Sequence, residues 1–170
     1  AELALLPPGL PDAATIAALV ARFQREGRTL SGSLRVARQL VLERLAVLDI
    51  EHNAPLQDVT SAMTALAEAT LEIALAQALA DADARHGAPL DAQGRRIEFW
   101  IVGMGKLGAR ELNVSSDIDL IYVYEDDGQT TGPATISAHE YFGKVAKHLY
   151  ALIGDATEDG FVFRVDLALR

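Results

Sequence analysis

The feature that most constrains this chain is a glycine-rich turn between two apolar segments. Residues 97–102 predict a strand, the glycine-rich segment 103–108 follows it, and residues 118–124 predict a second strand. Asp117 and Asp119, the acid pair, stand where the second strand begins. Strand side chains alternate, so both carboxylates point to one face, about 6 to 7 Å apart. They repel each other unless a cation lies between them, and a divalent metal bound by oxygen atoms is the simplest candidate.

The last apolar segment, residues 161–169, predicts a third strand that carries a third acid. One face is apolar throughout, and the other presents Arg164, Asp166 and Arg170. If this strand lies beside the strand of the acid pair with the polar faces matched, three carboxylates gather. Such a group can hold two Mg²⁺ or Mn²⁺ ions about 3.5 to 4 Å apart, an arrangement that serves phosphoryl and nucleotidyl transfer. Arg164 and Arg170 are then candidate partners for phosphate oxygens.

The first half of the chain predicts three antiparallel helices. Asp12 caps a helix that extends to about residue 26, and Thr29 or Ser31 opens a second that extends to about residue 51. Asn53 and Pro55 start a third, which ends near residue 85. Apolar spacing predicts the buried faces to be Ile16, Leu19, Val20 and Phe23, then Leu34, Leu40, Val41, Leu45 and Leu48, then Leu66, Ala69, Ile73, Ala76, Leu79 and Ala80.

The periodicity changes at a polar segment, residues 90–96. After it we expect a short helix at 106–112, between the first two strands, and a helix capped by Ser137 that extends to about residue 152. The predicted fold class is α+β: an antiparallel helical bundle in residues 1–90, followed by a mixed sheet with flanking helices in residues 97–170. Because the chain stops inside a predicted strand, we expect it to be part of a longer protein.

Composition excludes several functional classes. The net charge of −9 disfavours a nucleic-acid backbone as a partner. The most apolar run, residues 62–80, is interrupted by Glu68, Glu72 and Gln77, so we predict no membrane span. No cysteine and no N-terminal signal segment is present, which suits a reducing compartment and predicts a cytoplasmic protein.

Other motifs in the chain are weaker. Residues 103–108 match the dinucleotide fingerprint G-x-G-x-x-G, but the helix after them is short and the second strand carries acids where a buried parallel strand is apolar. Leu107 stands where a Walker motif needs Ser or Thr. Lys106 and Arg110 either contact phosphate or lie on a solvated helix face. The acidic segment 125–127 is interpreted as a solvated loop, and the four histidines as surface or packing residues.

Residues 103–121 and 159–167 resemble the corresponding motifs of the glutamine synthetase adenylyltransferase family. This resemblance implies a polymerase β-like nucleotidyltransferase fold in a bifunctional enzyme that adds and removes AMP on a tyrosine of glutamine synthetase. Arg164 and Asn113 resemble the adenylyl-removing domain, which implies phosphorolysis: phosphate attacks the adenylyl-tyrosine and releases ADP. The implied partners are adenylylated glutamine synthetase, a uridylylated nitrogen-signalling regulatory protein, adenine nucleotides (ATP, ADP or AMP) and phosphate.

The resemblance also assigns residues. Asp117 and Asp119 match the metal-binding pair and Asp166 the third acid. Ala109 stands where the family has glycine, and Ala168 where it has arginine. The candidate nucleotide- and phosphate-binding residues are Gly103, Gly105, Lys106, Ser115, Ser116, Arg164 and Arg170. Two alternatives stay open: the adenylylating, ATP-using domain of the same enzyme, and a non-catalytic module that docks regulators.

Overall fold

Local capping signals set the ends of the first three helices in the computed structural model, which describes residues 6–167. The helices are α1 (Ala13–Arg25), α2 (Leu30–His52) and α3 (Leu56–His86). Asp12 accepts a hydrogen bond from the backbone N–H of Thr15, and Thr29 accepts one from that of Gly32. Asn53 ends α2 in the left-handed conformation. All three predicted helices are confirmed, with ends close to those expected.

Helix α3 is the central element of the core, with α1, α2 and α5 (Ala138–Ile153) packed around it. The predicted buried face was wrong in its C-terminal half, where Ala76 and Ala80 are exposed and Ala74 and Ala78 are buried. An alanine-rich helix carries little amphipathic contrast, so spacing alone selects its face poorly. Within residues 6–167, α3 is the one helix long and apolar enough to cross a membrane, and 56% of its most apolar window is buried in the structure, as in a core helix.

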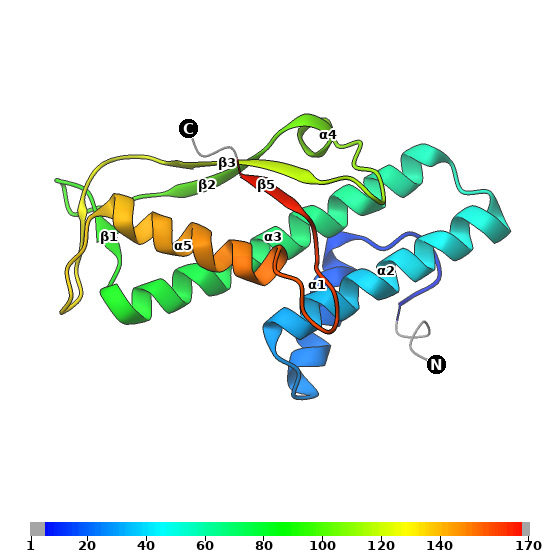
Figure 1. Cartoon of the computed structure of the whole chain (residues 1–170), viewed down its shortest axis with the longest axis horizontal. Coiled ribbons are helices and arrows are strands. Elements are labelled where there is room, and N and C mark those ends of the chain that lie inside the picture. The colour runs from blue at the N-terminus through cyan, green and yellow to red at the C-terminus, as the bar shows by residue number, and fades with distance from the viewer. Residues whose placement is uncertain (1–5, 168–170) are drawn as a thin grey trace.

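Three strands form a mixed sheet whose one face lies against the helices (Figure 1). Their order is β2 (Phe99–Gly103), β3 (Ile118–Tyr124) and β5 (Val165–Leu167). β2 runs antiparallel to β3, and β5 runs parallel to β3. The dinucleotide fingerprint requires a parallel βαβ unit, so the antiparallel pairing of β2 and β3 argues against that alternative. The mixed sheet itself is confirmed.

Two short strands that were not predicted pair at the far end of the molecule. They are β1 (Pro89–Leu90) and β4 (Gln129–Thr130), which run antiparallel. Their pairing joins the polar segment 90–96 to the acidic loop after β3. Each strand is only two residues long, so no period-2 pattern could have indicated it.

Two predicted elements are shorter than expected. The helix expected at 106–112 is the single turn α4 (Gly105–Gly108), and Arg110 just after it adopts the left-handed conformation with φ +61°. The strand expected at 161–169 begins only at Val165, because Val162 and Phe163 are both buried and the alternation fails there. Residues 168–170 lie outside the described part of the chain.

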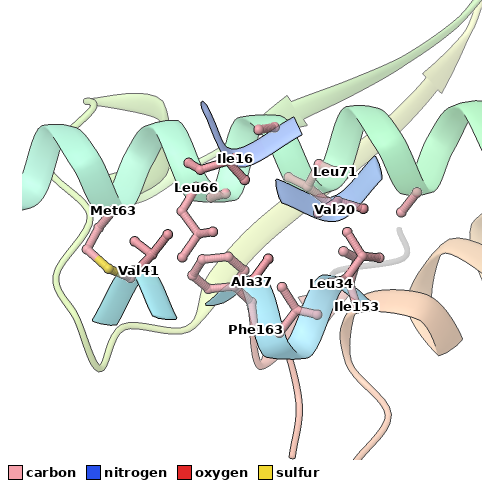
Figure 2. Packing of buried hydrophobic residues seen from close by; sticks show 14 of the residues in the cluster. Ile16, Val20, Leu34, Ala37, Val41, Met63, Leu66, Leu71, Ile153 and Phe163 are labelled. Atoms are coloured by element: carbon pink, nitrogen blue, oxygen red, sulfur yellow. The ribbon is translucent and has the colours of Figure 1, made fainter. Parts of the chain in front are cut away.

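One core joins the helical region to the sheet region. Ser137 caps α5 by accepting a hydrogen bond from the backbone N–H of Glu140, and the predicted inward face of α5 is buried. Ile118 and Leu120 on β3 belong to the same cluster as the apolar residues of α1, α2 and α3. Figure 2 shows Phe163 from the segment before β5 packed among residues of this cluster. The division at residues 90–96 stays a prediction.

Candidate functional site

The strand register places the third acid beside the acid pair. In the parallel ladder of β3 and β5, Asp119 is the direct partner of Asp166. Direct partners in neighbouring strands project to the same face of the sheet. Ile118 and Leu120, the neighbours of Asp119, are buried, whereas Asp119, Asp117 and Asp166 are exposed. The register therefore places Asp119 and Asp166 side by side on the open face, and the convergence of all three carboxylates stays a prediction.

Asp117 is held by an arginine from the neighbouring chain segment. The guanidinium of Arg164 donates from Nε to the Asp117 carboxylate and from Nη2 to the backbone carbonyl of Ser115, the latter at 3.0 Å. Both partners of the ion pair are about half exposed, so its contribution to stability is modest. The contact fixes the segment before β5 to the segment before β3. Arg164 thus lies at the site.

The glycine-rich turn is shaped by close packing against β3. A Cβ on Gly103 would lie 2.8 Å from Cγ of Leu107, and a Cβ on Gly108 would lie 2.5 Å from the carbonyl oxygen of Gly103. Gly105 has φ +53°, and a Cβ there would lie 3.2 Å from Oδ2 of Asp119. The backbone N–H of Met104 donates to the carbonyl of Asp119 at 2.9 Å. The turn therefore lies directly against one member of the acid pair, and Gly105 leaves that carboxylate uncovered.

The other predicted residues lie at different distances from the acids. Ser115 and Ser116 directly precede Asp117, and Ser115 contacts Arg164. Lys106 is exposed and lines a groove with the first turns of α3. Arg110 forms an ion pair with Glu68 on α3 at 2.9 Å. No contact of Lys106 with the three acids is therefore seen among the described residues.

Of the two residues that depart from the family pattern, Ala109 lies in the described part of the chain and Ala168 does not. Ala109 ends α4 with φ −79° and ψ −5°, a right-handed conformation open to any residue, so no glycine is required there. Ala168 and the predicted phosphate ligand Arg170 lie outside the described residues.

The three acids have the chemistry that a hard cation needs. Their side chains are too far apart in this structure for all three to bind one ion. All offer carboxylate oxygens, the donors that Mg²⁺ prefers. Among residues 6–167, however, no group of three His, Cys, Asp or Glu side chains lies close enough to hold a metal ion. Arg164 occupies one carboxylate of the three, so a metal ion would bind the acid pair after that side chain shifts. The uncovered carboxylate beside Gly105 is the observation that favours the fit.

Sequence reasoning missed two arginines of α2. Arg35 is only 1% exposed and donates to the backbone carbonyls of Gly160, Leu152 and Asp155. Burial lowers the pKa of Arg35, and the nearby carboxylates of Asp155 and Asp159 oppose this effect. A signal existed: Arg35 and the half-buried Arg38 stand within the apolar stripe of α2, where spacing calls for apolar residues.

The open face of the sheet also carries apolar side chains next to the acids. Trp100 and Val102 on β2 are the direct partners of Val123 and Ile121 on β3. All four are exposed, and they share the face of Asp119 because exposed positions alternate along β3. This surface therefore combines a carboxylate end with an apolar end.

Comparison with known proteins places the chain in a family. A family model described as glutamate-ammonia ligase adenylyltransferase matches residues 8–170. The chain belongs to this family. The resemblance inferred from the glycine-rich and acidic motifs is thereby confirmed.

Curated relatives agree with this assignment. A protein named bifunctional glutamine synthetase adenylyltransferase/adenylyl-removing enzyme from Burkholderia mallei is 48% identical over 143 residues, 83% of this chain and 16% of the relative. Proteins of the same name from Chromobacterium violaceum and Aromatoleum aromaticum are 49% and 42% identical, over 83% and 94% of this chain. The chain spans only 16% and 17% of the length of those two relatives.

Proposed function

We propose that this chain forms the catalytic core of a metal-dependent nucleotidyltransferase with a polymerase β-like fold. Its reaction is the phosphorolytic removal of AMP from an adenylylated tyrosine of glutamine synthetase, which gives ADP. The single observation that carries the proposal is the direct pairing of Asp119 with Asp166 on the exposed face of the sheet. The names of the relatives supply the substrate.

Each residue of the site has a role in this proposal. Asp117, Asp119 and Asp166 would hold Mg²⁺ or Mn²⁺, which would supply Lewis-acid stabilisation of the charge that develops on the transferred adenylyl group. The bare backbone at Gly105 lets the adenylyl group approach the Asp119 carboxylate without a side chain between them. Arg164 offers a fork of N–H donors to phosphate oxygens once it leaves Asp117.

The direction of the reaction and its control depend on the resemblance of Arg164 and Asn113 to the adenylyl-removing domain. A cytoplasmic location and regulation by a uridylylated nitrogen-signalling protein belong to the same proposal. The open apolar face beside the acids suits a macromolecular substrate, since such a face offers area for protein contact.

The test is ADP production by the purified protein incubated with adenylylated glutamine synthetase, phosphate and Mg²⁺. We expect Asp119→Asn to lower the rate by about 100-fold or more, since it removes a charge at the centre of the site. Asp127→Asn is the matched control: it makes the same change in the exposed loop after β3 and should leave the rate unchanged. A rate for Asp119→Asn within about threefold of wild type would contradict the assignment.

Two further assays separate the alternatives. AMP incorporation from ATP into unmodified glutamine synthetase, without phosphorolysis, would identify the adenylylating direction instead. Binding of glutamine synthetase with no Mg²⁺-dependent heat and no nucleotide chemistry would identify a docking module. Either result overturns the proposed reaction.

A further inference from the structure

Two arginines from distant parts of the chain converge on the ring of Phe161. Cζ of Arg38 lies 5.1 Å from the ring centroid, and Cζ of Arg164 lies 6.0 Å from it. Arg38 belongs to α2, whereas Arg164 immediately precedes β5. The neighbouring Arg35 holds these two segments together through its bond to the carbonyl of Gly160 at 2.7 Å. Both guanidinium groups therefore lie within about 6 Å of one ring centroid, and their positive charges act on each other.

Arg38 has no hydrogen-bond acceptor in the described part of the chain. Its Nε is buried and unpaired, and no carboxylate among residues 6–167 forms an ion pair with it. Burial lowers the pKa of Arg38, and the positive charge of Arg164 lowers it further. A half-buried cation placed beside a second cation is unfavourable unless an anion joins them.

Arg164 connects this pair to the three acids. Its Nε and Nη2 bond to Asp117 and to the carbonyl of Ser115, and its Nη1 makes no hydrogen bond within residues 6–167. Guanidinium groups bind phosphate oxygens through paired N–H donors. An anion that contacts both arginines would lie at the border of the site, next to Asp117.

We propose that Arg38 and Arg164 together bind an oxyanion, supplied by inorganic phosphate or by the phosphoryl group of a nucleotide. The inference rests on the proposed function, for which it locates the attacking phosphate. A phosphate oxygen forms a bond to the adenylyl phosphorus and the bond from that phosphorus to the tyrosine oxygen breaks. The phenolate takes up a proton from solvent, so the products are ADP and free tyrosine. Arg38 positions the phosphate through its charge.

The experiment is calorimetric titration of inorganic phosphate, without divalent metal, into wild type, Arg38→Gln, Arg38→Lys and Arg28→Gln. Arg28 is the matched control: its Cζ lies 5.9 Å from the ring centroid of Phe23, but it is exposed, and no second arginine of the described chain lies at that ring. We expect Arg38→Gln to weaken phosphate binding about tenfold or more, Arg38→Lys to weaken it less, and Arg28→Gln to leave it unchanged. If Arg38→Gln has a lower Tm than wild type, Arg38→Lys alone decides the test, and it must bind phosphate more weakly than wild type.

Parallel titrations with AMP distinguish the two sources of the oxyanion. Weakening with inorganic phosphate assigns the site to the attacking phosphate, and weakening with AMP alone assigns it to the nucleotide. Affinities of Arg38→Gln within about twofold of wild type for both ligands would overturn the proposal. An unchanged KM for phosphate in Arg38→Gln, with ADP still produced, would refute this site and leave the proposed function intact. Phosphate binding that depends on Arg38 in a protein that produces no ADP would refute the proposed function alone.

Discussion

Replacing Arg35 by methionine should destabilise the protein more than any change at its surface. Methionine keeps much of the volume of the side chain but removes all its donors. Three backbone carbonyl groups would lose their charged partner. They are those of Gly160, at 2.7 Å, Leu152, at 3.0 Å, and Asp155. The local bonds to Ser31, at 2.9 Å to its carbonyl and 2.6 Å to its hydroxyl, would be lost as well.

The magnitude follows from the number and burial of these bonds. A hydrogen bond to a charged group contributes about 1.5 to 3 kcal/mol, but burying the guanidinium has a cost that the variant avoids. We therefore expect a loss of about 4 kcal/mol, below the simple sum of the bonds. For a chain of this size that loss corresponds to a fall in Tm of about 8 to 16 °C.

Urea unfolding measures this loss directly, since the midpoint should fall while the slope with denaturant stays constant. Arg28→Met is the control, because Arg28 is exposed, and its midpoint should barely change. A loss below about 1 kcal/mol for Arg35→Met would refute the reasoning, because it would mean that the segment before β5 is held without this arginine.

Two further predictions concern the sheet. Gly103→Ala should cost about 1 to 3 kcal/mol in the same urea assay, because the new Cβ would lie 2.8 Å from Cγ of Leu107; full stability would show that the turn can relax. Tyr122→Phe should raise stability by about 1 kcal/mol at neutral pH, because the buried Tyr122 hydroxyl has no hydrogen-bond partner among residues 6–167. Burial raises the pKa of Tyr122 to about 12, so wild-type stability should fall as the pH rises from the ordinary tyrosine pKa towards that value. Tyr122→Phe should show a shallower fall, and an unchanged pH profile would contradict this account.

Local signals predicted much of this fold. Asp12, Thr29 and Ser137 each accept the hydrogen bond expected of a helix cap, since capping depends on residues only a few positions away. The bounds of β3 were also as predicted, because buried and exposed positions alternate at its start around Asp119. The same alternation made the common face of the acids predictable once the register with β5 was assumed.

Contacts between distant segments were not predictable in the same way. The segment before β5 departs from strand geometry because Val162 and Phe163 both enter the core, and Arg35 ties it to α2 from a position 125 residues away in the chain. The ion pair of Arg164 with Asp117 depends on that same packing. Arg35 shows the general difficulty: a charged residue in an apolar stripe signals a buried partner, but the sequence does not identify which one.

The central claim is that β3 and β5 bring their acids to one cation site, and calorimetric titration with Mg²⁺ tests it most directly. Asp166→Asn and Asp119→Asn should each weaken Mg²⁺ binding about tenfold or more, although 47 residues separate the two positions in the chain, because they are direct partners in the ladder. Mg²⁺ binding by Asp166→Asn equal to that of wild type would contradict the account.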